Sequence, residues 1–274
     1  MSRLLGIHAR PGKWLRRALA ILPFVLLIAV YSIASEIRHR DNPSDKLLPS
    51  FTQMGQAVER MAFTEDRRSG KYLMPADTLA SLKRLFIGIL LAAAVGLLLG
   101  LNMGVFPGMD HGANPFVVFL SMIPPLAILP ILFIVFGLGE LSKTALIVIG
   151  VFPTITLDTY LRSSGVPRQQ ITKGLTLGAS DFEVAYKIVL PQIMPGVLDT
   201  IRLNFKAVIL FLIAGESLAA TVGLGYRIFV VRRYLAMDII IPYVIWMSLL
   251  AFTADFLLRW YIERRYHWSA GGAE

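Results

Sequence analysis

The side chains that could do chemistry in this sequence are a few ionisable residues set in strongly apolar stretches. Glu216 lies in the tetrapeptide Ala-Gly-Glu-Ser near the end of an apolar run, and Lys83 and Arg84 lie near the start of another. An ionisable group inside a bilayer is costly and normally faces a water-filled cavity or a charged partner. Glu216 therefore either borders a solute pathway or pairs with a base such as Lys206 or Arg84 to lock the helices together.

The remaining charges near apolar stretches have simpler interpretations. Lys83 and Arg84 could attract an anion at the outer end of their span, or extend to the interface as long basic side chains commonly do. Asp158, near the inner end of a later span, is expected to meet a nearby base such as Arg162.

Familiar catalytic and metal-binding patterns are missing from the sequence. It has no cysteine, which excludes thiol catalysis, disulfides and thiolate metal sites, and its four histidines show no metal-ligand spacing. Neither Gly-x-Ser-x-Gly nor His-Glu-x-x-His is present, and there is no Gly-x-x-x-x-Gly-Lys-[Ser/Thr] phosphate loop. The sequence therefore predicts neither an enzyme nor a bound cofactor, and an intramembrane enzyme is the least favoured function.

The composition indicates an all-α integral membrane protein. Apolar residues make up 55% of the chain and charged residues only 16%, against about 25% charged in soluble domains. Several apolar runs approach the roughly 20 residues that cross a bilayer. Basic residues gathered at the cytoplasmic membrane edge account for the net charge of +9, and no basic segment interleaved with aromatics suggests a nucleic-acid partner.

The apolar runs predict six transmembrane helices. We expect a basic cytoplasmic segment at 1–17, an uncleaved first span at 18–34 and an external loop with short surface helices at 35–77. Residues 78–268 form a core of five spans, followed by a tail at 269–274; the spans are predicted at about 79–103, 115–137, 142–160, 205–220 and 239–260. This count places both termini and the polar loop 161–204 in the cytoplasm. Loop 221–238 then falls outside, although its three arginines oppose that side under the positive-inside tendency.

The second span carries a ridge of small residues. Gly88, Ala92, Gly96, Gly100 and Gly104 recur every four residues. Spans associate in lipid through close backbone approach at small side chains, so the ridge predicts tight packing inside the bundle.

The third span contains prolines that must break or kink it. Pro124 and Pro125 follow Ile123, and Pro130 comes five residues later. Because proline removes a backbone donor and clashes with the preceding turn, this stretch is predicted to be irregular. Irregular backbone at membrane depth survives where protein or a cavity surrounds it, so Pro124 and Pro125 either line or gate a pathway or form a purely structural kink.

The polar stretch from Gly178 to Pro191 specifies a short helix between two apolar regions. Ser180 and Glu183 have the spacing of a capping box, and Asp181 adds an acid to the first turn. Pro191 disfavours helical geometry at the residue before it. We therefore predict a helix of two to three turns that ends at this proline.

This segment resembles the EAA loop of ABC importer permeases, whose pattern is Glu-Ala-Ala, three residues, Gly, nine residues and Ile-x-Leu-Pro. Gly178, Ile188, Leu190 and Pro191 fall in register, whereas Thr172-Lys173-Gly174 stands in place of Glu-Ala-Ala, so the contact of the leading Glu is missing. Other stretches resemble the branch that serves nitrate, sulfonate, taurine and related small anions; they are Leu48-Pro49-Ser50, Ser81-x-x-Arg84, Ile123 to Pro130, Phe136 to Glu140 and Gly223-Leu-Gly225.

The resemblance implies a type I ABC importer permease fold with a cytoplasmic coupling helix. It implies contact with a separate ATPase through Gly178, Ala179, Ser180, Asp181, Phe182, Glu183, Tyr186, Leu190 and Pro191. The expected partners are two ATPase subunits that hold ATP and Mg²⁺, a second permease copy, an external or periplasmic substrate-binding protein and lipid, in the bacterial inner membrane. An ion-coupled secondary transporter is the alternative. It would need acids in mid-span and an inverted repeat, and the sequence offers Glu216 without a convincing repeat.

Overall fold

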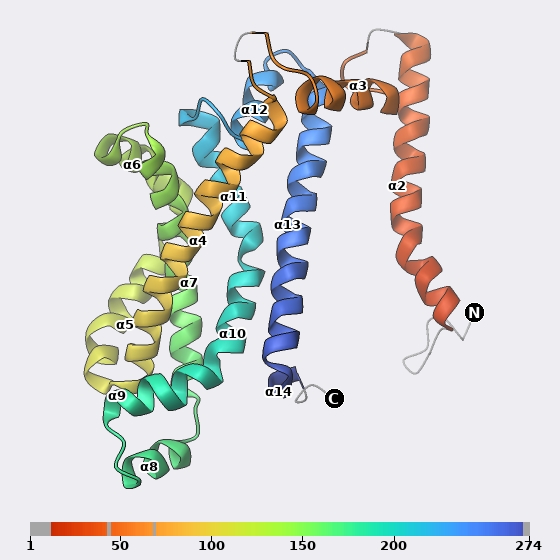
Figure 1. Cartoon of the computed structure of the whole chain (residues 1–274). Coiled ribbons are helices and arrows are strands. Elements are labelled where there is room, and N and C mark those ends of the chain that lie inside the picture. The colour runs from red at the N-terminus through yellow and green to blue at the C-terminus, as the bar shows by residue number, and fades with distance from the viewer. Residues whose placement is uncertain (1–11, 43–44, 68–69, 271–274) are drawn as a thin grey trace.

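The computed structural model describes residues 12–42, 45–67 and 70–270, so the predictions for 1–11 and 271–274 lie outside the described residues. The described chain is built of helices (Figure 1). Their bounds are α2 Lys13–Asp41, α3 Phe51–Ala62, α4 Leu73–Val105, α5 Pro107–Met122, α6 Leu129–Phe136, α7 Glu140–Ser164, α8 Arg168–Thr176, α9 Asp181–Glu183, α10 Leu190–Leu203, α11 Phe205–Ala219, α12 Leu224–Arg232, α13 Met237–Arg265 and α14 His267–Ala270. The 3₁₀ segment η1 covers Pro125–Ile128, and the π-helical segment η2 covers Val184–Val189.

Four of the described helices, α2, α4, α7 and α13, are long and apolar enough to cross a membrane. Two further pairs reach that length together but are bent, by 83° between α5 and the η1–α6 segment and by 56° between α11 and α12. The structure therefore agrees with the six predicted spans if each bent pair of helices is counted as one span. The helices form a long bundle with α3 at one end and α8 and α9 at the other (Figure 1); we call these the α3 end and the α8 end.

The small-residue ridge packs α4 directly along α7, as predicted. A Cβ atom built on Gly88 would lie 2.6 Å from Ile147 Cγ2, and one on Gly96 would lie 2.8 Å from Ile155 Cγ2. A Cβ atom built on Gly100 would collide with the backbone carbonyl oxygen of Thr156. The two helices therefore meet at a distance that only glycine permits.

The predicted irregularity in the third span is confirmed. α5 ends at Met122, and Pro124 adopts an extended conformation with φ −64° and ψ 117° before η1 begins at Pro125. The chain then turns back into α6, which packs against α7. The region predicted as one kinked span at 115–137 is therefore two helices joined at a sharp break.

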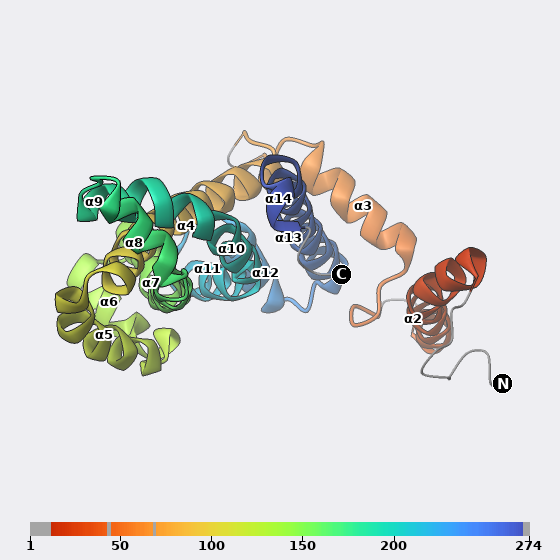
Figure 2. The same cartoon turned by 90° about the horizontal axis from the view of Figure 1, so that it is seen from below.

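α2 stands apart from the body of the molecule and is joined to it beside α3 (Figures 1 and 2). The Tyr31 hydroxyl donates to the Pro49 carbonyl (2.7 Å), and the Ser35 hydroxyl donates to the Leu48 carbonyl (2.9 Å). Within the predicted external loop 35–77, α2 continues to Asp41 and α4 starts at Leu73. The middle of this loop holds the expected surface helix, α3.

The predicted external loop 221–238 is wrong in its middle, because residues 224–232 form α12. The arginines made this stretch look like a polar loop, but Leu224, Ile228 and Val231 give it apolar surface. Leu224 and Val231 are buried against α13 together with Ile239 and Tyr243. A second core lies between α4, α7, α10 and α11.

Candidate functional site

Two groups of side chains stand out, one at the α8 end and one buried toward the α3 end. At the α8 end, the chain leaves α8 and reverses at Gly178, whose φ of +90° is a conformation that favours glycine. The Ser180 hydroxyl then accepts from the Glu183 N–H (3.3 Å), while the Glu183 carboxylate accepts from the Ser180 N–H (3.1 Å). The predicted capping box is therefore present.

The predicted helix stop at Pro191 is wrong. Residues 181–203 run as one helical rod, with α9 passing into the π segment η2 and then into α10 without a break. Pro191 lies in the first turn of α10 and Leu190 is helical, with φ −53° and ψ −50°. A π segment shifts the hydrogen-bond register by one residue, which lets the rod accommodate a proline that lacks an N–H. Sequence patterns based on α-helical spacing do not predict such a π segment.

A side chain of α4 and the residue that links α4 to α5 hold the start of this rod. The rings of Phe182 and Phe106 lie 5.4 Å apart between centroids, and Asn102 Nδ2 donates to the Tyr186 hydroxyl (3.1 Å). Phe182 is nevertheless 66% exposed. The ring is therefore held on one side and largely uncovered on the other.

Gly174, the last residue of the sequence that replaces Glu-Ala-Ala, lies against the same rod. A Cβ atom there would lie 2.6 Å from Ile188 Cδ1. Since the obstacle is the flexible end of a side chain, a small residue could be accommodated by a shift of Ile188. The departure at 172–174 therefore leaves the packing of α8 on η2 intact.

The charges of this segment are exposed and mutually compensating. Lys187 Nζ donates to Glu183 Oε1 at 2.7 Å. This bond, together with the backbone N–H of Ser180, lowers the pKa of Glu183 from its ordinary value of 4.5 to about 2. Glu183 is therefore ionised, and the capping box intact, throughout the physiological pH range.

The second group is centred on Glu216, which is fully buried and paired with Arg84. Arg84 Nη1 lies 2.7 Å from Glu216 Oε1, and its other nitrogens bind both oxygens of Glu140 at the start of α7. Lys143 Nζ also reaches Glu140 Oε1 at 3.0 Å. Of the two interpretations of Glu216, the geometry supports the helix lock, with Arg84 rather than Lys206 as the base.

The same cluster holds the start of α12 by its backbone. Three successive N–H groups each find a side-chain acceptor: Gly223 donates to Asp77 Oδ1 (2.9 Å), Leu224 to the Ser81 hydroxyl (2.9 Å) and Gly225 to Glu216 Oε2 (2.8 Å). Carboxylates at a helix N-terminus are stabilised by its dipole. The turn between α11 and α12 is thus fixed to α4.

Asp77 is the member of this cluster that sequence reasoning missed. Its carboxylate is fully buried and accepts from Arg227 Nε (2.8 Å) and from the Tyr243 hydroxyl (3.2 Å). We assigned Asp77 to an external loop and Arg227 to another. The signal available was Arg227 itself, a base on the side that the positive-inside tendency disfavours, which could have indicated a buried acidic partner.

The other predicted residues are placed apart from this cluster. Lys83 is exposed although its neighbour Arg84 is buried, so the two basic residues do not act together. Pro124 and Pro125 lie at the break between α5 and α6, beside α7 and α11. The predicted pairing of Asp158 is confirmed: its Oδ2 lies 2.6 Å from both Arg162 Nε and the Thr200 hydroxyl.

Comparison with known proteins identifies the fold and the family. Residues 88–267 match the family model described as binding-protein-dependent transport system inner membrane component. The chain belongs to this family. It is 36% identical to a putative ABC transporter permease protein of Methanocaldococcus jannaschii, over 69% of this chain and 71% of the relative. It is 30% identical to the taurine transport system permease protein TauC of Escherichia coli K12, over 66% of each protein.

Further matches support the same branch and the fold. The putative aliphatic sulfonates transport permease protein SsuC of Escherichia coli K12 is 26% identical over 50% of this chain and 52% of the relative. A solved inward-facing structure of the MetNI methionine ABC transporter superposes with a TM-score of 0.56 at 18% identity, covering 67% of this chain and 93% of that one. The chain is thus an ABC importer permease of the type I fold, and the predicted nitrate, sulfonate and taurine branch is confirmed.

Proposed function

We propose that this permease forms the membrane pathway of an ATP-driven importer for a small anionic solute of the sulfonate or taurine type. ATP and Mg²⁺ would be held by separate ATPase subunits, and an external binding protein would deliver the solute. The names of its relatives support the solute class, since taurine and aliphatic sulfonates share an anionic sulfonate group. We place the protein in the bacterial inner membrane, as a dimer surrounded by lipid, with both termini in the cytoplasm.

The observation that carries this proposal is the segment that projects at the α8 end. α8 extends beyond the other helices, and η2 packs against it (Figure 1). Leu177 and Phe182 are 79% and 66% exposed there. One large apolar side chain in the turn after α8 and one at the start of the capped helix that follows fit insertion into a groove of an ATPase. The rod from 181 to 203 leads directly into α11, so movement at Phe182 would reach the spanning helices.

Co-purification with the candidate ATPase tests the proposal. The permease is expressed with the ATPase, extracted in mild detergent and captured through a tag on the permease, as wild type, Phe182→Asp or Gly178→Asp. An aspartate at 182 buries a charge in the interface, and one at 178 is strained at positive φ; we expect each to reduce the retained ATPase by about tenfold or more. The matched control is Phe63→Asp, a 76% exposed phenylalanine beside α3 at the opposite end of the bundle.

Two results would count against the assignment. Normal ATPase retention by both folded variants would place docking elsewhere on the chain. A wild-type permease that never retains an ATPase would favour the secondary transporter instead.

A further inference from the structure

Two buried bases share one exposed carboxylate at the start of α7. Arg84 Nη2 and Lys143 Nζ both donate to Glu140 Oε1, at 2.8 and 3.0 Å, and Arg84 Nε donates to the other carboxylate oxygen. The side chains of Arg84 and Lys143 are 7% and 4% exposed, whereas that of Glu140 is 63% exposed. The Glu140 carboxylate therefore lies between two buried cations and the molecular surface, and its side chain is free to turn outward without a change of fold.

The two bases depend on Glu140 to different degrees. Arg84 Nη1 also donates to Glu216 Oε1 (2.7 Å) and to the Val222 carbonyl (2.8 Å). Lys143, in contrast, forms an ion pair with Glu140 and with no other carboxylate of the described chain. A buried charge that loses its partner is strongly unfavourable. When Glu140 turns outward, Lys143 therefore requires another anion at the same point.

The charge and the geometry of this group suit a monoanion with several oxygens. Arg84 and Lys143 balance Glu216 and Glu140, so the group is neutral with Glu140 in place and carries one positive charge without it. A guanidinium binds two oxygens of one anionic group side by side, and an ammonium binds as a compact point charge. A sulfonate head offers two oxygens to Arg84 and a third to Lys143.

Three of the sequence stretches that resemble the anion-importing branch meet at this group. Ser81 and Arg84 come from one of them, Glu140 ends the second, and Gly225 of the third donates to Glu216. We propose that the anionic head of the transported solute, a sulfonate, replaces the Glu140 carboxylate on Arg84 and Lys143 during passage, and that Glu140 returns when the solute leaves. This inference rests on the proposed function and adds a solute site to it.

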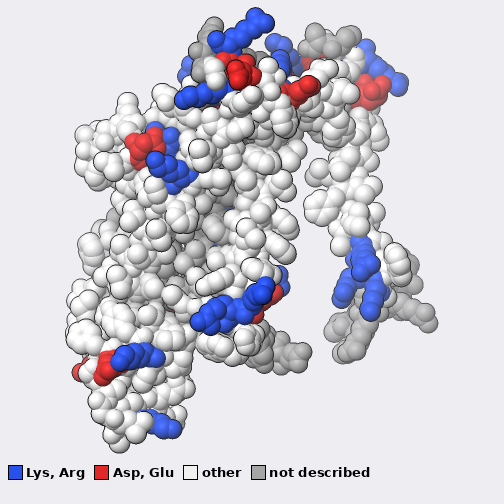
Figure 3. Space-filling model, in the orientation of Figure 1, with Lys and Arg blue, Asp and Glu red and all other residues white. Residues whose placement is uncertain are grey.

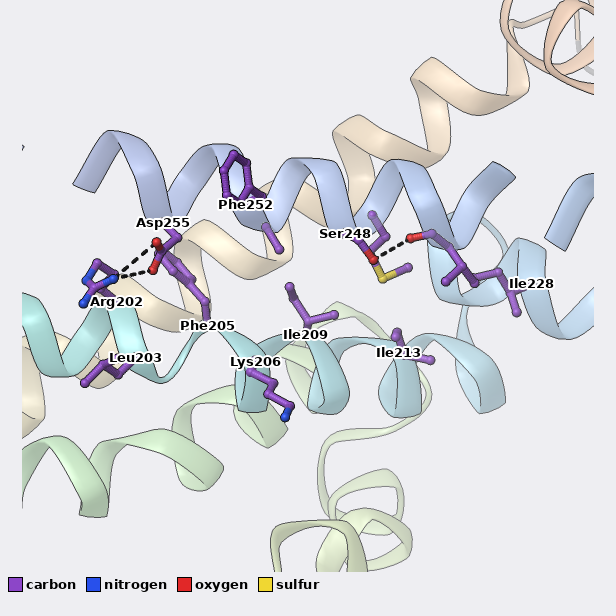
Figure 4. A pocket seen from close by; sticks show the side chains of 13 residues that line it. Arg202, Leu203, Phe205, Lys206, Ile209, Ile213, Ile228, Ser248, Phe252 and Asp255 are labelled. Carbon is purple, nitrogen blue, oxygen red and sulfur yellow. Dashed lines mark hydrogen bonds and ion pairs between the residues drawn. The ribbon is translucent and has the colours of Figure 1, made fainter. Parts of the chain in front are cut away.

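The groove between α13 and the rod formed by α10 and α11 is a poorer place for the anion (Figure 4). One of its bases, Arg202, pairs with Asp255 at 2.9 Å. Figure 4 shows the other, Lys206, with its ammonium directed away from α13. The bases of that groove therefore do not converge on one point, as Arg84 and Lys143 do.

Rescue of a variant that lacks the carboxylate tests the site directly. Glu140→Ala leaves Lys143 without its counter-charge and makes room for an added anion. In the permease–ATPase complex in lipid-free detergent, we measure the permease that stays soluble after heating, with sodium methanesulfonate or with the same concentration of sodium chloride. At saturation we expect methanesulfonate to raise the midpoint of Glu140→Ala by about 3 °C or more above chloride, and that of the wild type by about 1 °C or less, because Glu140 occupies the site.

Two further variants separate a site from a general salt effect. Adding Lys143→Met to Glu140→Ala removes the buried ammonium, so the methanesulfonate concentration needed for rescue should rise about tenfold or more, as expected for one lost charge-assisted bond. The matched control is Glu36→Ala, which removes an exposed carboxylate from the exposed Arg40 and should not respond. A Glu140→Ala variant that responds no more than Glu36→Ala overturns the inference. Rescue by phosphatidylglycerol but not by methanesulfonate overturns it in favour of a lipid headgroup.

Import by Lys143→Met tests the role in transport and does not depend on Glu140→Ala being folded. This variant keeps the pair of Glu140 and Arg84 and replaces a buried ammonium with an apolar chain of similar length. In proteoliposomes with ATPase and saturating binding protein, we expect alkanesulfonate import to fall about tenfold or more, with ATPase retention as in the wild type. Lys206→Met, which removes an exposed base of α11, should import normally.

The outcomes of this assay distinguish the site from the proposed function. Wild-type import by Lys143→Met refutes the solute site alone, because the complex still works as an importer. A wild-type complex that imports no small anion refutes the proposed function.

Discussion

At the scale of single residues, the buried charges in the described part of the chain each have a counter-charge. Glu216 has Arg84, and Asp77 has Arg227, each pair inside the bundle. Taking ions out of water is costly, and their attraction offsets this only where geometry is good and the remaining hydrogen-bonding positions are filled. Here the remaining carboxylate oxygens accept from Ser81, Tyr243 and the backbone of the α12 start. Such a pair is expected to be far more sensitive to losing one partner than an exposed one.

Arg84→Met should therefore destabilise the permease by about 3–5 kcal/mol, because it leaves the Glu216 carboxylate buried without its base. The adjacent Lys83→Met should change stability by about 0.5 kcal/mol or less, since Lys83 is exposed. Thermal unfolding of the purified variants in detergent measures the difference. Equal midpoints for the two variants would show that Glu216 does not depend on Arg84.

At the exposed capping box, removing one charged side chain is expected to change a pKa rather than to unfold the protein. Lys187→Ala removes the largest contribution that lowers the pKa of Glu183, which should rise from about 2 toward 4.5. Because the folded pKa lies below the unfolded one, the stabilisation from this group is present above pH 4.5 and is lost as pH falls toward 2. A carboxyl-carbon NMR titration of labelled Glu183 reports the midpoint; a midpoint near 4.5 in the wild type would contradict the ion pair.

At the scale of helices, the α4–α7 contact depends on glycine at positions where backbone faces backbone. Gly100→Ala would bring its methyl group against the Thr156 carbonyl, which cannot move as a side chain can. We expect a loss of about 1–3 kcal/mol, typical of overpacking. Gly112→Ala, in the helix α5 with nothing within 4 Å of the new Cβ atom, should be neutral or slightly stabilising. Unfolding midpoints of both variants test this; a tolerated Gly100→Ala would mean that the helices can separate.

The sequence predicted those elements whose signal is local. The glycine ridge, the break at Pro124 and the capping box at Ser180 each follow from the chain's own spacing, and all three are present. Elements that depend on distant partners were missed. Arg227 made α12 look like a polar loop, because its partner Asp77 is 150 residues away in sequence. Likewise, a proline such as Pro191 normally ends an α-helix. Here the π segment before it shifts the backbone hydrogen bonds by one residue, and the helix continues.

At the scale of the whole molecule, the charges mark two polar ends separated by an apolar band. Figure 3 shows basic and acidic side chains gathered toward the α3 end and toward the α8 end of the visible face, with mostly uncharged surface between them. If the N-terminus lies in the cytoplasm, as we propose, counting spans places the α8 end there as well. The arginines of 221–238 seemed to oppose this orientation, but Arg227 is neutralised by Asp77 and Arg232 lies over the Phe229 ring at 4.5 Å. The ion pair with Asp77 thus offsets one of the three basic charges in this stretch.

The orientation can be tested with single cysteines, because the native chain has none. Thr64→Cys lies in an exposed turn after α3, and Gln169→Cys lies on the exposed surface of α8. In spheroplasts, a membrane-impermeant maleimide should label Thr64→Cys and leave Gln169→Cys unmodified until the membrane is permeabilised. The reverse pattern would place α8 and α9 on the side away from ATP. It would also remove the basis for ATPase docking at Phe182, because the coupling segment must share a compartment with the subunit that hydrolyses ATP.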